Sequence, residues 1–419
     1  MVKVHSRSAL VVAIALLASG ADWPQFRGPD GNGIGSGAAP VTWSATENVA
    51  WKTALPGFGA SSPIVVGQRV LLTGYSGYGQ DQDEPGNMQN LKHHTFCLNL
   101  ADGKVLWDRA EKAKQPEKEY RGFLALHGYA SGTPVTDGKT VYAFFGASGV
   151  YAYTVEGKPL WSANVGSTVH EWGSATSPVL FRNLVVVNAS VESQSLVALD
   201  KKTGKVAWKL GNIDQSWSTP LLVDLPGGKQ ELVLSIKNKV LGIDPATGKG
   251  LWVCDGVPDY ICPSLVAHQG VVYVTAGRKP MSLAVRAGGR GDVTKSHKLW
   301  EIKETSKVAT PLYHEGHLYW LDNKATAYCI KADSGAVAYK ERLDVSGKGD
   351  KVYASPVLAD GKLYMVTRQD GVVVLAASPT FQKLAHNRLG DESIFNATPA
   401  IVDGRLLIRS DRFLYCIGK

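Results

Sequence analysis

Residues 198–208 read Ala198-Leu-Asp-Lys-Lys-Thr-Gly-Lys-Val-Ala-Trp208, and this string decides the fold because it recurs along the chain. An apolar strand leads into a turn closed by Gly204, and a second strand carries the large aromatic Trp208. Glycine suits the turn because it adopts a positive φ without strain. The recurrences, in chain order, are Cys97…Asp102-Gly103…Trp107, Tyr151…Glu156-Gly157…Trp161, Gly242…Asp244…Thr247-Gly248…Trp252 and Cys329…Ser334-Gly335…Tyr339. The string therefore predicts a repeated β-hairpin.

A second pattern marks the start of each repeat: a small or hydroxyl-bearing residue, a proline and an apolar β-branched run. It occurs at Ser62-Pro63, Thr133-Pro134, Ser177-Pro178, Thr219-Pro220, Cys262-Pro263, Thr310-Pro311, Ser355-Pro356 and Thr398-Pro399. Six of the seven intervals between successive prolines lie within 42–48 residues, and the first is 71 residues. Such a period is that of a four-stranded propeller blade. The pattern therefore predicts eight blades.

The two ends of the chain complement one another. The last repeat stops at Leu414-Tyr-Cys-Ile417, its third strand, while Val49-Ala-Trp51-Lys52 reads as a fourth strand with no blade before it. Pairing these strands closes the ring and hides both edges. We therefore expect an all-β, eight-bladed β-propeller of four-stranded antiparallel blades over residues 41–419, whose last blade is completed by the N-terminal strand. Residues 22–40 are expected to form a lead-in, and residues 1–21 a signal peptide.

The composition agrees with this architecture. The 419 residues include 45 Gly and 11 Trp but only 4 Met, which is typical of short strands and tight turns rather than of a helical bundle. Most of the tryptophans fall on the fourth strands, where they are expected to wedge between neighbouring blades as structural residues. These predicted blade-seam aromatics are Trp51, Trp107, Trp161, Trp208, Trp252, Trp300 and Tyr339.

The N-terminus has the layout of a secretory signal peptide. Lys3 and Arg7 precede an apolar run from Ala9 to Ala18, and small residues follow up to Ala21. The run is too short to span a bilayer, and the cleavage region near Gly20 and Ala21 holds no Cys that could carry a lipid anchor. We therefore expect a periplasmic or secreted protein, monomeric and without a transmembrane segment.

Charge and cysteine usage give weaker indications. The net charge is +8, but the basic residues are spread along the chain, so no nucleic-acid partner is expected. Of the five cysteines, only Cys254 and Cys262 are placed so that they could pair. The alternative is that both are small buried hydrophobes.

Extra chain length concentrates on one face of the predicted ring. Tyr75 to Lys92 and Arg109 to Leu126 both emerge there, and long loops on a rigid scaffold are common binding elements. The loops that enter the blades on that face carry aromatic and titratable side chains that can form a cup around the channel mouth. The candidate ligand-binding residues are His127, Tyr129, His170, Glu171, Trp172, Asp214, Trp217, Tyr260, Lys351 and Tyr353. The alternative is that these side chains plug the channel and pack under the long loops.

The sequence indicates neither catalysis nor metal binding at this face. The histidines, including the adjacent pair His93-His94, lack the tight spacing of metal ligands. No nucleophile motif is present either. We therefore predict no metal site and no catalytic residue.

The string Ala198-x-Asp-x-x-Thr-Gly-x-x-x-Trp208 resembles the repeats of PQQ-binding-like β-propellers, the family of quinoprotein dehydrogenases and of outer-membrane assembly factors of the BamB type. The lead-in Asp22-Trp-Pro-Gln-Phe-Arg-Gly28 is similar to the start of an exported bacterial subgroup. For the dehydrogenases, the resemblance implies PQQ in the channel, a divalent cation on its carbonyl and an Asp base. This chain departs from them because it has no adjacent cysteine pair and no Cys-x-x-Cys-His haem motif.

The expected function is an exported, non-catalytic scaffold that binds a protein or ligand through its loop-rich face, by analogy with BamB in envelope assembly. An envelope protein, a small ligand or a glycan would be its partner, and no cofactor is predicted. One alternative is a PQQ-dependent alcohol or sugar dehydrogenase with Ca²⁺ as its cation. The other is a polysaccharide-binding module. Fold alone does not decide among these, because the same blades serve enzymes and scaffolds.

Overall fold

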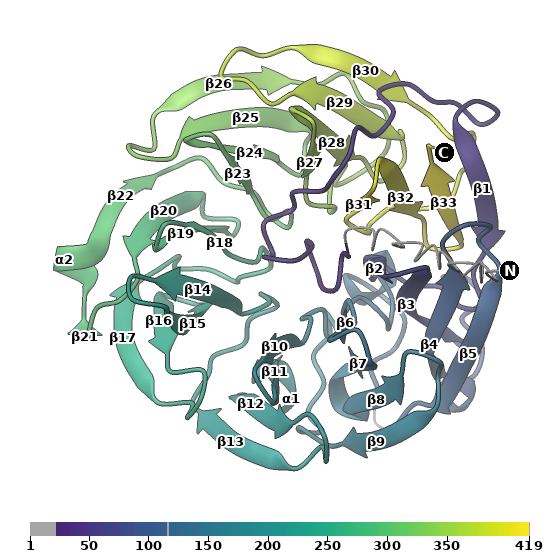
Figure 1. Ribbon diagram of the computed structural model, residues 1–419, viewed down its shortest axis with the longest axis horizontal. Helices are drawn as coiled ribbons and strands as arrows, with labels where there is room; N and C mark the ends of the chain where they lie inside the picture. The colour runs from purple at the N-terminus through teal and green to yellow at the C-terminus, as the bar shows by residue number, and fades with distance from the viewer. Residues whose placement is uncertain (1–21, 115–116, 419) are drawn as a thin grey trace, which may run out of the picture.

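A computed structural model describes residues 22–114 and 117–418. Eight separate antiparallel sheets follow one another around a central channel (Figure 1), and the prediction of an eight-bladed β-propeller is confirmed. The predicted signal peptide, residues 1–21, lies outside the described residues.

In blades 1 to 7 the first strand lies innermost and the chain proceeds outward strand by strand, whereas the N-terminal strand forms the outer strand of blade 8 (Figure 1). Blade 1 comprises β2 (Ile64–Val66), β3 (Arg69–Ser76), β4 (Lys92–Asn99) and β5 (Val105–Lys112). Blade 2 comprises β6 (Val135–Thr136), β7 (Thr140–Phe144), β8 (Val150–Thr154) and β9 (Pro159–Ala163). Blade 3 comprises β10 (Val179–Phe181), β11 (Leu184–Ala189), β12 (Ser195–Asp200) and β13 (Val206–Gly211). Blade 4 comprises β14 (Leu221–Leu225), β15 (Lys229–Ile236), β16 (Lys239–Ile243) and β17 (Gly250–Asp255).

The second half of the chain repeats this arrangement. Blade 5 comprises β18 (Val266–His268), β19 (Val271–Ala276), β20 (Met281–Arg286) and β22 (Lys298–Ile302). Blade 6 comprises β23 (Leu312–His314), β24 (His317–Leu321), β25 (Thr326–Lys331) and β26 (Val337–Arg342). Blade 7 comprises β27 (Val357–Ala359), β28 (Lys362–Val366), β29 (Val372–Ala376) and β30 (Lys383–Asn387). Blade 8 comprises β31 (Ala400–Val402), β32 (Arg405–Arg409), β33 (Phe413–Ile417) and β1 (Val49–Ala54).

The helices described are short and lie in connections. They are the α-helices α1 (Ser190–Ser193) and α2 (Thr294–His297) and the 3-10 helices η1 (Met88–Asn90), η2 (Leu124–Leu126) and η3 (Gly146–Ser148). None within the described ranges has the length and apolar character that a membrane crossing requires. The short strand β21 (Gly291–Asp292) extends blade 4, where it pairs in parallel with β17.

The ring closes as predicted. Strand β1 pairs antiparallel with β33, with Trp51 opposite Cys416 and Ala54 opposite Phe413. The N-terminal strand therefore becomes the outer strand of blade 8, and the first and last parts of the chain lie side by side (Figure 1).

Aromatic side chains on the outer strands join each blade to the next. The indole N–H of Trp161 in blade 2 donates to the Lys201 carbonyl of blade 3 at 2.9 Å, and the ring covers Gly204. Four further tryptophans make the same contact with the next blade: Trp51 to Leu100, Trp107 to Val155, Trp208 to Pro245 and Trp300 to Ala332.

The other two predicted seam aromatics differ. Trp252 donates to the Glu231 carboxylate of its own blade at 2.7 Å, because the chain between β20 and β22 forms β21 and α2 instead of a short hairpin. Tyr339 makes a T-shaped contact with Phe381 of blade 7, with 5.5 Å between ring centroids.

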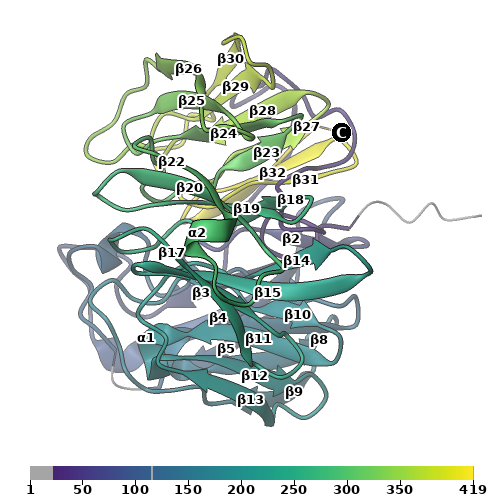
Figure 2. The same ribbon diagram turned by 90° about the vertical axis from the view of Figure 1, so that its left-hand side faces the viewer.

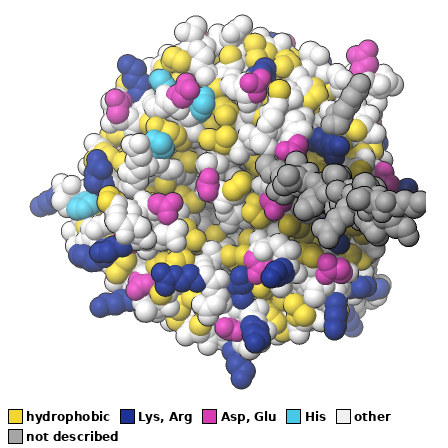
Figure 3. All heavy atoms as spheres, viewed as in Figure 1, with side chains coloured by type: hydrophobic (Ala, Val, Ile, Leu, Met, Phe, Trp, Pro, Cys, Tyr) yellow, Lys and Arg dark blue, Asp and Glu magenta, His cyan; other side chains and the backbone are white. Residues whose placement is uncertain are grey.

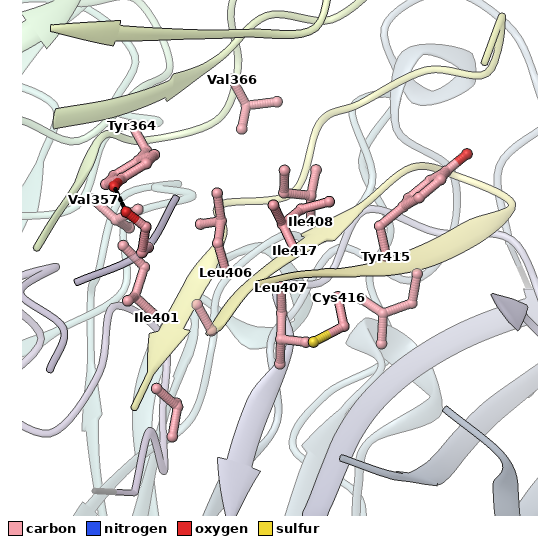
Figure 4. Close-up of a cluster of buried hydrophobic side chains, with 14 of the residues drawn as sticks. Val357, Tyr364, Val366, Ile401, Leu406, Leu407, Ile408, Tyr415, Cys416 and Ile417 are labelled. Carbon is pink, nitrogen blue, oxygen red and sulfur yellow. Dashed lines mark hydrogen bonds between the residues drawn. The ribbon is translucent and has the colours of Figure 1, made fainter. Parts of the chain in front are cut away.

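Apolar side chains fill the spaces between blades. Figure 4 shows the cluster between blades 7 and 8, where Tyr364 and Val366 of β28 face Leu406 and Ile408 of β32. The five cysteines are all free. Cys254 is buried in the core between blades 4 and 5, and Cys262 lies at the channel.

A ring of eight hydroxyl groups encircles the channel where the first strands begin. In each blade a backbone N–H donates to the hydroxyl of the next blade, at N–O distances of 2.9–3.1 Å, and Thr398 donates to Ser62 to complete the circle. The members of this hydroxyl ring are Ser62, Thr133, Ser177, Thr219, Ser264, Thr310, Ser355 and Thr398.

The fifth member of the ring corrects the sequence pattern. Cys262-Pro263 matched the small-residue–Pro motif, but the hydroxyl that accepts from Thr219 belongs to Ser264, two residues later. A hydroxyl oxygen accepts an N–H well, whereas a thiol accepts weakly. The need for this hydroxyl acceptor, and not the position of Pro263, therefore sets the register of blade 5.

Candidate functional site

The lead-in crosses one mouth of the channel and leaves a cavity of about 300 Å³ beside it, against blades 2 to 5. From blade 1, where Trp23 and Val65 exchange two backbone hydrogen bonds of 2.8 Å, it crosses the centre of the ring to blades 6 and 7 (Figure 1). There the Arg27 guanidinium, 1% exposed, donates to the Pro311 carbonyl at 2.7 Å and to four other carbonyl oxygens. Burial lowers the pKa of Arg27 to about 9, which leaves it charged at neutral pH. A cation that forms no ion pair within the described part of the chain therefore lies beneath the channel.

Short turns form most of this face, which we call the hairpin face. Its Lys and Arg side chains are spread around the rim and mixed with Asp and Glu (Figure 3). On the opposite, loop-rich face, the connections before β4 and before β6 project from the ring (Figure 2). The two faces therefore differ in shape: the lead-in crosses the channel mouth on the hairpin face and long connections surround the mouth on the loop-rich face.

A cavity of about 170 Å³ opens at that mouth, and we call it the cup. The hydroxyl ring lines its lower part together with Phe26 of the lead-in. The remaining polar and aromatic side chains that line it are Phe123, His127, Ser131, Trp172, Trp217, Tyr260, Cys262, Arg278, Lys307, Tyr353 and Asn396.

Aromatic rings form one wall of the cup. Trp172 is their centre: its ring centroid lies 4.8 Å from that of Trp217, 4.9 Å from that of Tyr260 and 5.2 Å from that of Phe123. The Trp217 indole donates to the Gly173 carbonyl at 2.8 Å. The Trp172 indole N–H and the Tyr260 hydroxyl are buried and have no hydrogen-bond partner among the described residues. Buried polar atoms are nearly always paired, so these two donors are available to a molecule that enters the cavity.

Cations stand at the mouth. The Arg278 guanidinium lies over the rings of Tyr260, Phe123 and Trp172, with 5.4–5.9 Å between its central carbon and the ring centroids. Asp259 fixes the Arg278 loop by accepting from the backbone N–H groups of Arg278 and Lys279. Lys307 is neutralised in part by Asp350, at 2.6 Å.

The other polar groups of the cup are already engaged or neutral. His127 donates from Nε2 to the Trp172 carbonyl at 2.9 Å and contacts the Ser131 hydroxyl through Nδ1 at 2.6 Å. Burial lowers the pKa of His127 to about 4, so its ring is neutral. The Asn396 amide is held by Arg368 and the Leu126 carbonyl. Burial raises the pKa of Cys262 to about 12, so its thiol is protonated and a poor nucleophile.

The structure brings together five of the predicted ligand-binding residues: His127, Trp172, Trp217, Tyr260 and Tyr353 all line the cup. His170 stands behind the wall, where its ring packs on Trp172 and Trp217 at 5.5 and 5.0 Å.

The remaining four candidates lie away from the cup. Tyr129 packs into a buried cluster of tyrosines and donates to the Lys118 carbonyl at 2.6 Å, which corresponds to the packing alternative. Glu171 and Asp214 are exposed beside their loops. The Lys351 ammonium donates a hydrogen bond to the Val345 carbonyl oxygen.

Sequence reasoning missed Phe26, Phe123, Arg278 and Lys307. Phe26 stands in the lead-in, and Arg278 in the connection between β19 and β20, so no local pattern links either to the channel. The hydroxyl ring carried a signal, because the Ser/Thr-Pro motif marked seven of its eight members, but that motif was interpreted only as a repeat marker.

The cup does not fit the calcium–PQQ arrangement of quinoprotein dehydrogenases. Ca²⁺ takes oxygen ligands, chiefly carboxylates. No carboxylate lines the cup. Within residues 22–114 and 117–418, no group of three His, Cys, Asp or Glu side chains is placed to hold a metal ion.

Comparison with known proteins agrees with the fold. A family model described as outer membrane protein assembly factor BamB matches residues 92–255 and 286–408. The structure is similar to that of BamB from Moraxella catarrhalis, with a TM-score of 0.65 and 12% identity over 88% of this chain and 97% of that chain. It is also similar to the computationally designed Ika8 protein, with a TM-score of 0.61 and 13% identity over 87% of this chain and 98% of that chain.

One characterised relative is an enzyme. Tetrathionate hydrolase of Acidithiobacillus ferrooxidans is 20% identical over 350 residues, which are 75% of this chain. The match spans 64% of the length of that relative.

Proposed function

The chain belongs to the family of the outer membrane protein assembly factor BamB, and on that basis we propose that it is an exported scaffold that holds a protein partner of the cell envelope on its loop-rich face. The observation that carries the proposal is the asymmetry of the ring. The lead-in covers the centre of the hairpin face, whereas the loop-rich face presents a cup walled by long connections. Loops placed on a rigid scaffold are the usual means of recognition.

The rim of the cup offers both aromatic and charged side chains for contact with a partner. Phe123 is 41% exposed, and charged side chains surround it in the same connection. The neighbouring connection carries the exposed residues Asp81, Asp83 and Glu84. An exposed aromatic with a polar rim is the composition of a protein-binding patch.

Export is the second half of the proposal. The basic, apolar and small-residue segments of residues 1–21 support it. N-terminal sequencing of the protein purified from its native host should show a mature chain that begins near Ala21. A chain that retains Met1 would contradict export by this route.

The partner is tested by site-specific photo-crosslinking in cells. A crosslinking amino acid replaces Phe123 or Glu84 on the loop-rich face, and Lys139 or Lys202 in hairpins of the opposite face serve as matched exposed controls. Both loop-rich positions should yield adducts with the same envelope protein, and the controls should not. Equal adducts from both faces, or adducts only with polysaccharide, would contradict the proposal.

A further inference from the structure

The inventory of polar groups in the cup is one-sided. Arg278 and Lys307 are cations, and the indole N–H of Trp172 and the hydroxyl of Tyr260 are donors. Two of the potential acceptors are already used or weak: the Asn396 carbonyl oxygen accepts from Arg368 at 2.8 Å, and Cys262 is a half-buried thiol. With no carboxylate in its lining, the cup has little to offer a cation or an amine.

The hydroxyl ring adds donors to the floor. Each of its eight oxygens accepts a backbone N–H from the preceding blade. Within the described residues, none of these hydroxyls donates to a protein acceptor, although each lines the cup and is at most 9% exposed. A hydroxyl that accepts one hydrogen bond still has its own hydrogen to donate. The floor therefore presents converging O–H donors to whatever enters.

The fixed charges near the cup also favour an anion. Arg27 lies beneath the floor and donates to the carbonyl oxygens of Thr310, Pro311 and Pro356, beside the hydroxyl ring, with no carboxylate in ion-pair distance among the described residues. Arg278 at the mouth makes no ion pair within the described residues, although the Asp259 carboxylate that accepts its backbone N–H lies near. Asp350 neutralises Lys307 in part, so the positive charge near the cup that has no ion-pair partner belongs to Arg27 and Arg278. Positive charge at the mouth and beneath the floor raises the local concentration of anions.

The aromatic walls of the cup favour a planar ligand. Trp172, Tyr260 and Phe123 present ring surfaces to a cavity of about 170 Å³. An apolar protein cavity of about 150 Å³ holds one benzene molecule. The cup therefore accommodates a single small ring more readily than an extended polymer.

We propose that the cup binds a small planar organic anion, of the class of aromatic carboxylates, with its negative charge held by Arg278 and its ring packed against the aromatic wall. The remaining oxygen atoms accept from the hydroxyl ring. This site lies inside the rim that is proposed to hold the partner protein, and Phe123 belongs to both. The proposal rests on the donors and rings of the cup and not on the scaffold role, and it requires no metal ion.

The test is calorimetric titration of the purified mature protein with benzoate, benzylamine and tetrathionate. Benzoate carries both recognised features, benzylamine carries the ring with a positive charge, and tetrathionate carries negative charge without a ring. Saturable binding of benzoate alone is the expected result. The proposal would be overturned if benzoate did not bind, or if benzylamine bound as tightly as benzoate. If tetrathionate bound as tightly as benzoate, the part of the proposal that requires a planar ring would be overturned.

Two variants locate the site. Arg278→Gln should weaken benzoate binding roughly ten- to hundredfold, the usual effect of losing a hydrogen bond between charged groups. Arg286→Gln removes the same charge from the exposed end of β20 at the hairpin face and should leave the affinity within about twofold. Equal effects of the two variants would show that benzoate responds to net charge and not to the cup. Unchanged far-ultraviolet circular dichroism of both variants confirms that they are folded.

Discussion

At the scale of single residues, the tryptophan–glycine pairs explain the repeated string. The indole ring of one blade lies flat on the glycine that closes the hairpin of the next blade, so any side chain at that glycine would collide with it. At Gly204, φ is +70° and an added Cβ would stand 2.6 Å from the Trp161 ring. The glycine is thus required twice, once by the turn and once by the neighbouring blade.

Substitution of two glycines separates these requirements. Gly204→Ala should lower the free energy of unfolding by about 2–4 kcal/mol, because it combines a strained φ with a collision. Gly361→Ala is the control: φ is +68° there but nothing lies within 4 Å of the added Cβ, so only about 1 kcal/mol should be lost. Urea denaturation of both variants measures the difference. Equal losses would mean that the Trp161 contact does not constrain the turn.

Glu192 is a second residue with a measurable consequence. It lies in α1, is 2% exposed and accepts a hydrogen bond from Ser174. Burial, with a smaller contribution from Glu117, raises the pKa of Glu192 from 4.5 to about 7. Between these values the folded protein keeps a proton that the unfolded chain has released, so this residue makes stability fall as pH rises.

Glu192→Gln should remove that dependence. The variant should gain stability relative to the wild type by about 2–3 kcal/mol between about pH 5 and pH 8, since each pKa unit corresponds to about 1.4 kcal/mol. Denaturant unfolding at several pH values measures the gain, and Glu171→Gln, at an exposed carboxylate, should show none. A difference that does not change with pH would contradict the assignment.

At the scale of elements, the hydroxyl ring ties eight inner strands into one circle. Serine and threonine alternate around it without exception, from Ser62 to Thr398. Each hydroxyl replaces the hydrogen bond that an inner strand would otherwise lack at the channel, because its own sheet has no strand on that side. The ring therefore sets the register of every blade against its neighbour.

Thr310 allows this to be tested with isosteric changes. Its hydroxyl accepts the Ser264 N–H at 2.9 Å, and the residue is 2% exposed. Thr310→Val keeps the shape but leaves that N–H unpaired, so it should lose about 1–3 kcal/mol of stability. Thr310→Ser keeps the hydroxyl and should lose less than about 1.5 kcal/mol. Thermal unfolding ranks them, and a serine variant less stable than the valine variant would contradict the role of the hydroxyl.

The elements also show how far the sequence could predict the molecule. Blade number, strand order and ring closure follow from short-range patterns, because each blade repeats one hairpin chemistry. The motif placed the ring residue of blade 5 two positions too early, because Cys262-Pro263 matches the motif whereas Ser264 makes the hydrogen bond. The cup was predicted only in part: its aromatics sit in blade-entry loops, but Arg278 and Phe26 reach it from elements that only the closed ring brings together. Tyr129 shared the same loop context yet packs beneath the long connections.

At the scale of the whole molecule, one N-terminal segment performs two tasks. Residues 22–40 cross the hairpin face, and β1 completes blade 8. Without β1, β33 would become the exposed outer edge of blade 8, and Leu100 of blade 1 would lose its contact with Trp51. Exposed edge strands promote association, so closure protects the protein as well as stabilising it.

Two truncations of the mature chain distinguish these tasks. Removal of residues 22–40 takes away Trp23 and Arg27 but keeps β1, so the protein should remain a closed, monomeric propeller of lower stability. Removal of residues 22–54 also deletes β1, and because blade 8 then lacks its outer strand, the protein should lose several kcal/mol more and associate through β33. Light scattering after size exclusion reports the association, and urea unfolding reports the stability. If both truncated chains were monomeric with the same unfolding midpoint, strand β1 would not be what holds the ring closed, and the boundary proposed at residue 41 would have to move.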